Sequence, residues 1–330
     1  MSGPEPIKNV SDLWQDTAGC WQRLPNKAFF FVLLAAWLAL FHLLGNSILG
    51  YVHTPSLFLW MYHAYNGAAG AGVDDEHCNF IPFIVVGLFW WKRHELLDSR
   101  LQFWGPGLGI LVFGMLLQIF AYTAQLPQVS IVALFAGIYG LMGLAWGLEW
   151  LRKSFFPFFL FAFSVPLGAH GTLITFPLRL LVTWLVAGIC HIFGIDVIRT
   201  GTELSNPFGT FQYDVAPACS GIRSLVAIFL LATIFAFFTL RSGWKRLFLI
   251  ALALPFAVLA NLLRLIIVIT AAQIGGQKTG DWVHDDWFTS LLPYVPAFVG
   301  FVFVGQWLEK QEAQSFEGLE VAPEATPELK

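Results

Sequence analysis

"LFLIALALPFAVLANLLRLIIVITAA" (residues 247–272) decides the fold class of this 330-residue chain. An α-helix needs about 20 mainly apolar residues to cross a bilayer, and this stretch exceeds that length with a single charged residue, Arg264. Further apolar runs lie at 28–48, 79–91, 103–122, 128–149, 154–169, 173–194, 219–240 and 289–308. Charged residues make up 12% of the chain, against about 25% in soluble domains. We therefore predict an all-α polytopic membrane protein.

The distribution of lysine and arginine predicts the topology. These residues cluster at 8–27, 92–100, 152–153 and 241–246 and in the C-terminal tail, and the positive-inside rule places all of these segments in the cytoplasm. If 173–194 crossed the membrane, the cluster at 241–246 would lie outside. We therefore interpret 173–194 as an amphipathic helix on the outer face. The other runs then form about eight transmembrane helices, with both termini cytoplasmic.

The same reasoning predicts the domain organisation. Residues 1–27 form a cytoplasmic N-terminal segment, 28–308 a single integral-membrane domain, and 309–330 an acidic, disordered cytoplasmic tail. Within an outer segment, "IDVIRTGTELSNPFGTFQYDVAP" (195–217) alternates apolar and polar residues around Gly and Asn-Pro turn signals. This alternation predicts a small hairpin cap.

A cysteine at the start of a predicted helix is the first candidate for chemistry. In "ACSGIRSL" (218–225), Cys219 follows Pro217 at the outer end of its helix, where backbone N–H groups and the helix dipole favour a thiolate. Ser220 and Gly221 keep the approach to the thiol open, and Arg223 lies one turn deeper on the same face. The alternatives are a nucleophile and an inert packing thiol, and Arg223 could support the thiolate or brace the cap.

Arg264 and two histidines complete the candidate set. Arg264 is predicted about eight residues below the outer end of its helix, a depth at which a charge marks a functional site or a paired partner. Asn261 shares its face. We favour an unpaired arginine facing a water-filled cavity over a structural ion pair. His284, in "DWVHDDWF" (281–288), and His77, in "DDEHCNF", lie in outer segments and are the competing proton carriers.

The spacing of potential ligands predicts no metal and no cofactor. The four cysteines show no CxxC pair, and neither His77 nor His284 is part of an HExxH motif. Nucleic-acid binding is not expected either, because the basic clusters are short topology signals.

Three motifs together resemble those of the exosortase/archaeosortase family, membrane enzymes analogous to sortases. "ACSGIRSL" is similar to the family's cysteine motif, "PFAVLANLLRL" (255–265) to its Asn-x-x-Arg motif, and His284 to its histidine. "EHCNFIPFIVVGLFWWKRHEL" (76–96) resembles the family's Ser-His-Gly stretch, although Glu, His and Cys stand at 76–78. The chain also has "DDWFTS" after His284, where the family often has a glycine.

The resemblance implies a cysteine transpeptidase or protease in the bacterial plasma membrane. Such an enzyme cleaves C-terminal sorting signals of secreted proteins on the outer face: a Pro-Glu-Pro motif, a transmembrane helix and a basic tail. It implies that Cys219, Arg264 and His284 are catalytic and that Arg223, Asn261, Ser220, Gly221 and His77 bind substrate or support them. The acceptor is either an amine on a lipid- or polysaccharide-linked anchor or water, and the residues do not decide between these.

The main alternative is a polytopic transporter or a membrane scaffold linked to exopolysaccharide export, without covalent catalysis. Arg264 would then be a charge on a substrate path. Such a protein would be expected to show inverted repeats with broken helices in both halves, and the sequence shows no internal repeat. A glutamyl intramembrane protease would need paired glutamates and histidines on neighbouring helices, which the sequence lacks.

Overall fold

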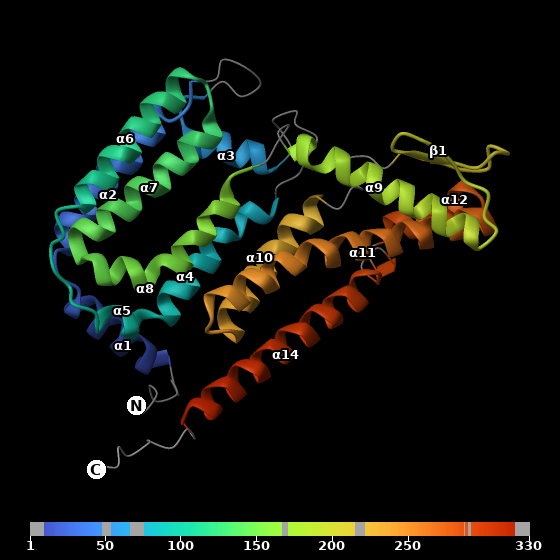
Figure 1. Ribbon diagram of the computed structural model, residues 1–330. Coiled ribbons are helices and arrows are strands. Elements are labelled where there is room, and N and C mark those ends of the chain that lie inside the picture. Colours follow the sequence, from blue (N-terminus) through green and yellow to red (C-terminus); the bar gives the residue numbers. More distant parts are fainter. Residues whose placement is uncertain are drawn as a thin grey trace, which may run out of the picture. The chain divides into compact units, whose positions relative to one another are not determined.

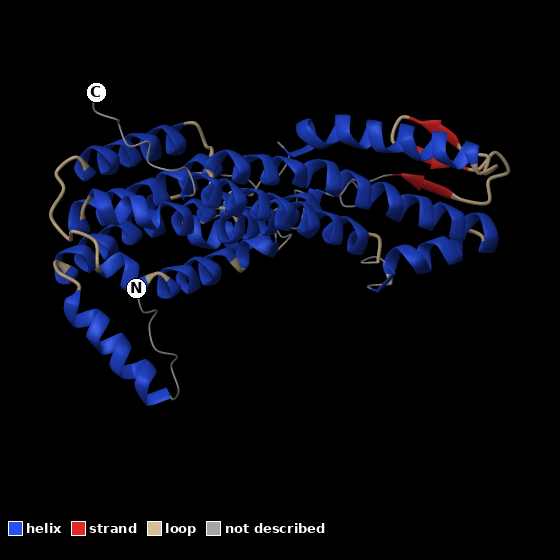
Figure 2. Ribbon diagram, turned by 60° about the horizontal axis from the view of Figure 1, so that its bottom comes forward, coloured by secondary structure: helices blue, strands red, loops and turns tan. Residues whose placement is uncertain are grey.

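A computed structural model describes residues 10–47, 54–66, 76–166, 171–214, 222–286, 288–289 and 292–320. These residues are almost entirely helical, with three short strands (Figures 1 and 2). The chain divides into two compact units, Met1–Leu167 and Gly168–Lys330. Each unit has its own hydrophobic core and is described by itself.

The first unit is built around α7. Its elements are α1 (Val10–Arg23), α2 (Lys27–Leu44), α3 (Leu57–Tyr65), η1 (Glu76–Asn79), α4 (Ile81–Trp91), α5 (Arg93–Leu97), α6 (Gly107–Thr123), α7 (Pro127–Trp146), α8 (Leu148–Phe159) and η2 (Leu160–Ser164). Large aromatic side chains fill the core, among them Trp37, Phe41 and Trp146. The buried indole N–H of Trp37 donates to the Leu134 carbonyl at 3.0 Å, which joins α2 to α7.

Helices α6 and α7 pack backbone against backbone along a glycine seam, formed by Gly107 and Gly114 of α6 and Gly137 and Gly140 of α7. A Cβ at Gly107 would lie 2.6 Å from the Leu144 amide nitrogen, and one at Gly140 would lie 2.7 Å from the Leu111 amide nitrogen. Small residues allow membrane helices to approach this closely. The seam therefore determines how tightly α6 and α7 pack.

The second unit combines long helices with a small sheet. Its elements are α9 (Gly171–Ile192), β1 (Ile198–Thr200), β2 (Glu203–Ser205), β3 (Gln212–Asp214), α10 (Ile222–Thr239), α11 (Gly243–Gly275), α12 (Gln277–Asp285) and α14 (Tyr294–Glu320). The antiparallel sheet has the order β1-β2-β3, with Leu204 opposite Arg199 and Tyr213. One core joins the sheet and α9 to α11, and another joins α10, α11 and α14.

A buried carboxylate connects α14 to the turn between α10 and α11. The side chain of Glu312, 7% exposed, accepts hydrogen bonds from the backbone N–H of Arg241 at 3.0 Å and of Ser242 at 2.6 Å. These are amides at the N-terminal end of α11, where a negative charge is favourable. Glu312 therefore caps α11 from a distant part of the chain.

The structure confirms the all-α polytopic membrane class. Helices α2, α7 and α11 are long and apolar enough to cross a membrane, and shorter apolar helices lie at 107–123, 176–192 and 228–239. The small cap at 195–217 is also confirmed, and it has a third strand, β3. The total of about eight spans and the topology stay predictions.

Three features differ from the sequence-based expectation. Helices α3 and α12 lie in segments predicted to be outside the membrane, where no helix was predicted. Helix α14 continues to Glu320, whereas disorder was expected from residue 309. The reason is that 309–320 is rich in strong helix formers and that Glu312 is held by the turn before α11. The boundaries of the membrane domain at 28 and 308 stay predictions, and within them the chain divides after Leu167.

Candidate active site

Arg264 and His284 are brought together because α12 folds back along α11. Gly276, with φ 76°, ends α11 and starts the reversal, a backbone conformation that glycine adopts at little cost. Helix α12 then packs antiparallel to the last turns of α11 (Figure 1). As a result, the guanidinium Nη2 of Arg264 donates to the carbonyl oxygen of His284 at 3.3 Å.

Two side chains in this part of α11, the buried Asn261 and the half-buried Arg264, have unused hydrogen-bonding capacity. The Nε of Arg264 and both polar atoms of Asn261, which is 2% exposed, have no hydrogen-bond partner among the described residues. No carboxylate in the described part of the chain forms an ion pair with Arg264. Buried polar groups are nearly always satisfied in folded proteins. Arg264 and Asn261 therefore provide donors and an acceptor suited to a peptide carbonyl or an anion.

The depth of Arg264 differs from the expectation. The expectation placed it about eight residues before the end of its helix. In the structure α11 ends at Gly275, eleven residues after Arg264. At about 1.5 Å per residue this is roughly 17 Å of helix. The difference arises because α11 continues beyond its apolar run until Gly276 ends it.

The imidazole of His284 is oriented by its neighbour in sequence. Its Nδ1 lies 2.8 Å from a carboxylate oxygen of Asp285, and its side chain is 27% exposed. A carboxylate at one ring nitrogen selects the tautomer and orients the ring for proton transfer at the other nitrogen. His284 thus has the local geometry of a general acid or base.

The cysteine motif falls on a different part of the chain. Cys219, Ser220 and Gly221 lie outside the described residues, as does the side chain of Arg223, whose backbone is in the first turn of α10. Cys219 is five residues after the end of β3 at Asp214 and three before the start of α10 at Ile222. The roles of these four residues stay predictions.

His77 belongs to the first unit, whereas Arg264 and His284 belong to the second. It lies in η1, where its Nε2 is 3.5 Å from the Cys78 sulfur, and the Cys78 thiol donates to the Phe163 carbonyl at 3.2 Å. Burial lowers the pKa of His77 from its ordinary value of 6.5. The environment of His77 therefore favours a neutral imidazole.

One cluster in the first unit has the composition of a metal site. Ligand atoms of Asp16, Cys20 and His94 all lie within 4.8 Å of one another. However, Arg93 already pairs with Asp16 at 2.6 Å, and burial together with Asp16 raises the pKa of the Cys20 thiol. A cation and a protonated thiol both oppose metal binding. We interpret the cluster as the ionic contact that joins α1 to α5. The Asp-x-x-x-Cys spacing in α1 is the signal that could have revealed it from sequence.

Comparison with known proteins identifies the family. The model of the transmembrane exosortase family (Exosortase_EpsH) matches residues 70–303, a range that holds Cys219, Arg264 and His284. The chain belongs to the transmembrane exosortase family. No curated protein and no solved structure matches it.

The match covers most of this exosortase but not its two ends. It begins before η1 and ends within α14, so it excludes α1, α2 and α3 and the helical turns that carry Glu312. The contact between Arg264 and His284 lies inside the matched region. The ionic contact between α1 and α5 involves a helix outside it.

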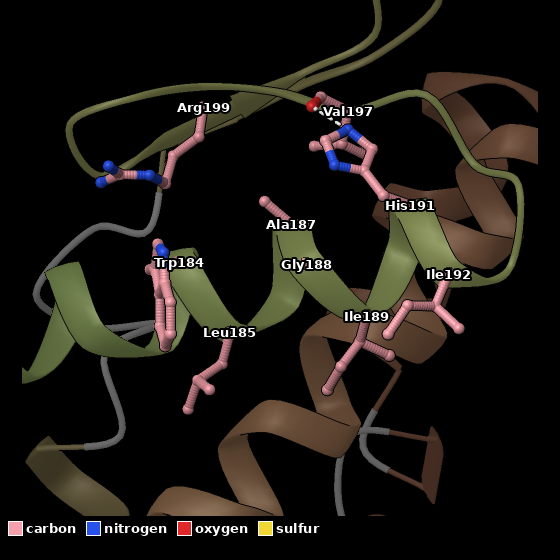
Figure 3. Close-up of a pocket in the computed structure, with 9 residues that line it drawn as sticks. All are labelled: Trp184, Leu185, Ala187, Gly188, Ile189, His191, Ile192, Val197 and Arg199. Atoms are coloured by element: carbon pink, nitrogen blue, oxygen red, sulfur yellow. Dashed lines mark hydrogen bonds between the residues drawn. The ribbon is translucent and has the colours of Figure 1, made fainter.

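A cavity of about 510 Å³ lies in the second unit of the exosortase, between α9 and the start of the sheet (Figure 3). At the edge of the cavity, the Nε2 of His191 lies 2.9 Å from the carbonyl oxygen of Val197. The lining is mainly apolar, with the Arg199 side chain at one end, and consists of Trp184, Leu185, Ala187, Gly188, Ile189, His191, Ile192, Val197 and Arg199. Neither Arg264 nor His284, the predicted catalytic residues that the structure describes, lines this cavity.

The lowered pKa of His77 predicts a pH-dependent stability of the exosortase. Below pH 6.5 the unfolded chain binds a proton that the folded protein does not, so the free energy of unfolding falls as the pH drops through this value. Replacing His77 with glutamine, which is neutral in both states, should reduce this dependence. Equilibrium unfolding in detergent at about pH 7.5 and about pH 5.5 measures it. An equal pH dependence in His77→Gln would contradict the prediction.

Proposed function

We propose that this exosortase is a cysteine transpeptidase or protease that cleaves the C-terminal sorting signals of secreted proteins. Its site would face the outside of a bacterial plasma membrane. The observation that carries the proposal is the contact between Arg264 and His284 in a chain that belongs to the exosortase family. The same unit contains Cys219, the third member of the predicted set.

The proposed reaction has two steps. The Cys219 thiolate attacks the scissile carbonyl, a thioester forms, the C–N bond breaks, and the leaving amine takes a proton from His284. An incoming amine or a water molecule then gives a proton to His284 and attacks the thioester, which releases the thiolate. An amine acceptor, on a lipid- or polysaccharide-linked anchor, gives transpeptidation, and water gives hydrolysis.

The other residues have electrostatic roles in this proposal. The Arg264 guanidinium donates to the oxyanion that develops in each step. Asn261, whose amide has no partner among the described residues, binds a backbone group of the substrate next to the scissile bond. The pairing of His284 with Asp285 stabilises the imidazolium between the two steps. No metal or cofactor takes part.

The predicted topology supports this choice of substrate. A substrate helix with its basic tail in the cytoplasm would present the bond before the helix near the outer surface, where Cys219 is expected. The substrate would then approach from the bilayer.

A reporter assay tests the proposed function. The reporter carries a C-terminal Pro-Glu-Pro motif, a transmembrane helix and a basic tail, and its mass is measured after co-expression. We expect processing by the wild-type protein and none by Cys219→Ala, because alanine cannot form the thioester. Cys190→Ala is the matched control, since this thiol is buried in α9 and 1% exposed, and it should process the reporter normally.

The reporter mass also distinguishes the acceptors. A cleaved reporter that ends in a free carboxylate indicates hydrolysis. A cleaved reporter heavier than this hydrolysis product indicates transfer to an amine. Processing by Cys219→Ala at the wild-type rate would contradict covalent catalysis through this thiol. An absence of processing by the wild-type protein would instead favour the transporter or scaffold alternative.

A further inference from the structure

The strand that leads towards Cys219 docks on the helix that carries His284. Strand β3 is at an edge of the sheet, so the outward backbone groups of Gln212 need partners. The side-chain amide of Gln277, in the first turn of α12, supplies both of them. Its Oε1 accepts from the Gln212 N–H at 2.8 Å, and its Nε2 donates to the Gln212 carbonyl at 3.4 Å. One glutamine amide therefore continues the sheet onto α12.

Tyr213 adds a second contact between the same elements. Its hydroxyl donates to the backbone carbonyl oxygen of Gln277 at 3.3 Å. Burial, together with the charge and hydrogen bond of Asp281, raises the pKa of Tyr213 to about 12. The phenol is therefore protonated near neutral pH and acts as a donor.

Helix α12 is shaped to receive the tyrosine. A Cβ at Gly280 would lie 2.0 Å from the Tyr213 hydroxyl oxygen and 2.8 Å from the Ala272 Cβ of α11. The absence of a side chain at Gly280 thus allows Tyr213, α12 and α11 to meet at one point. Nε2 of Gln277 also donates to Asp281 at 2.9 Å, which orients the amide that holds β3.

We propose that Tyr213 and Gln277 are positioning residues, which hold the strand before Cys219 against the helix that carries His284. This inference rests on the proposed function for its catalytic meaning. The five residues that follow Asp214, up to and including Cys219, reach at most about 18 Å, so a fixed β3 limits where the thiol can lie relative to α12. Helix α12 is itself fixed to α11 through Arg264 and the His284 carbonyl. We define the clamp as Tyr213, Gln277 and Gly280. It connects β3, which leads to Cys219, with α12, which carries His284, and with α11, which carries Arg264.

Several charged groups surround this clamp. Asp281 and Asp285 of α12 face Tyr213, and Glu203 of β2 accepts from the Gln212 side chain at 2.7 Å. Arg264 of α11 is the cation that contacts the His284 backbone. Neither Tyr213→Phe nor Gln277→Met removes any of these charges. Effects of the two substitutions therefore report on the position of β3 relative to α12.

The test compares Tyr213→Phe and Gln277→Met with the wild-type full-length protein in detergent. Tyr213→Phe keeps the ring and removes the hydroxyl, and Gln277→Met keeps the length of the side chain and removes the amide. Tyr122→Phe is the matched control, because it removes a hydroxyl from an exposed tyrosine of the first unit. Two readouts are used: kcat and KM for the reporter, and the pH dependence of the rate at which a small maleimide alkylates Cys219, followed by peptide mass spectrometry.

We expect each clamp variant to lower kcat by about 10-fold to 100-fold, the scale of a small misplacement of reacting groups, with KM nearly unchanged. The pH profile of Cys219 alkylation should shift from that of the wild-type protein towards that of His284→Ala. A purely structural role would lower the unfolding temperature without this shift. Tyr122→Phe should match the wild-type protein in both readouts.

The outcomes separate this inference from the proposed function. If Cys219→Ala is inactive but both clamp variants keep the wild-type kcat and alkylation profile, the positioning role is wrong and the proposed function stands. If the wild-type protein processes no reporter, the proposed function fails, and the alkylation profile alone decides the inference. In that case a shifted profile in both clamp variants supports the positioning role, and an unshifted profile overturns it.

Discussion

Replacing Arg264 by alanine is expected to slow reporter processing by about 10²-fold to 10³-fold, the usual effect of removing one oxyanion donor. The guanidinium is half-buried in α11, its Nη2 contacts the His284 carbonyl, and its Nε has no partner among the described residues. The substitution removes the positive charge proposed to stabilise the oxyanion and the hydrogen bond to α12. The loss should appear mainly in kcat, because the charge matters most in the transition state.

Arg264→Lys distinguishes charge from geometry. Lysine keeps the charge but presents one ammonium instead of a planar fork of donors, so we expect it to recover only part of the lost activity. Lys278→Ala is the matched control, since it removes one positive charge from the exposed surface of α12. It should process the reporter normally. A rate close to that of the wild-type protein in Arg264→Ala would contradict the proposed role.

Replacing Gly140 by alanine is expected to lower the free energy of unfolding by about 1–3 kcal/mol, the usual cost of overpacking. A Cβ at Gly140 would lie 2.7 Å from the Leu111 amide nitrogen and 3.0 Å from the Gly107 carbonyl oxygen. Both are backbone atoms, so α6 and α7 must move apart along the glycine seam. This separation costs more than alanine gains through its helix propensity. Equilibrium unfolding in detergent micelles measures the change.

Gly109→Ala, on the neighbouring helix α6, should give the opposite result. Nothing lies within 4 Å of a Cβ at Gly109, so only the helix propensity changes, by up to about 1 kcal/mol in favour of alanine. We therefore expect Gly109→Ala to be neutral or stabilising and Gly140→Ala to be destabilising. Similar effects of both substitutions would show that the seam does not determine the stability of the first unit.

The helices of the long apolar runs could be predicted because their signal is local. Residues 247–272 form the central part of α11, and 128–149 largely coincide with α7. The small sheet also followed from alternation at 195–217. Helix α12 was missed because it is short and polar, with "QKTGDWVHD" as its sequence. It is held by α11 and β3, contacts that no local pattern reveals.

The candidate site was predicted in part for the same reason. A charge inside an apolar run made Arg264 stand out, and the structure places its guanidinium next to the backbone carbonyl of His284. The catalytic roles of both residues stay predictions. The sequence did not indicate Tyr213, Gln277 or Gly280 as functional. Their proposed role depends on an edge strand that meets a helix, and the hydrogen-bonded residues are 64 or 65 positions apart. Such pairings become visible only when the tertiary structure is known.

The cap that Glu312 provides has a consequence for the biosynthesis of the protein. Seventy residues of chain separate Ser242 from the carboxylate that binds its amide. A chain emerges from the ribosome with its N-terminal parts first, so α10 and α11 are complete well before Glu312 exists. Unpaired amides are costly in hydrocarbon, and the turn between these helices must therefore stay hydrated during this interval. The last helix to be synthesised completes the assembly of the unit that carries Arg264 and His284.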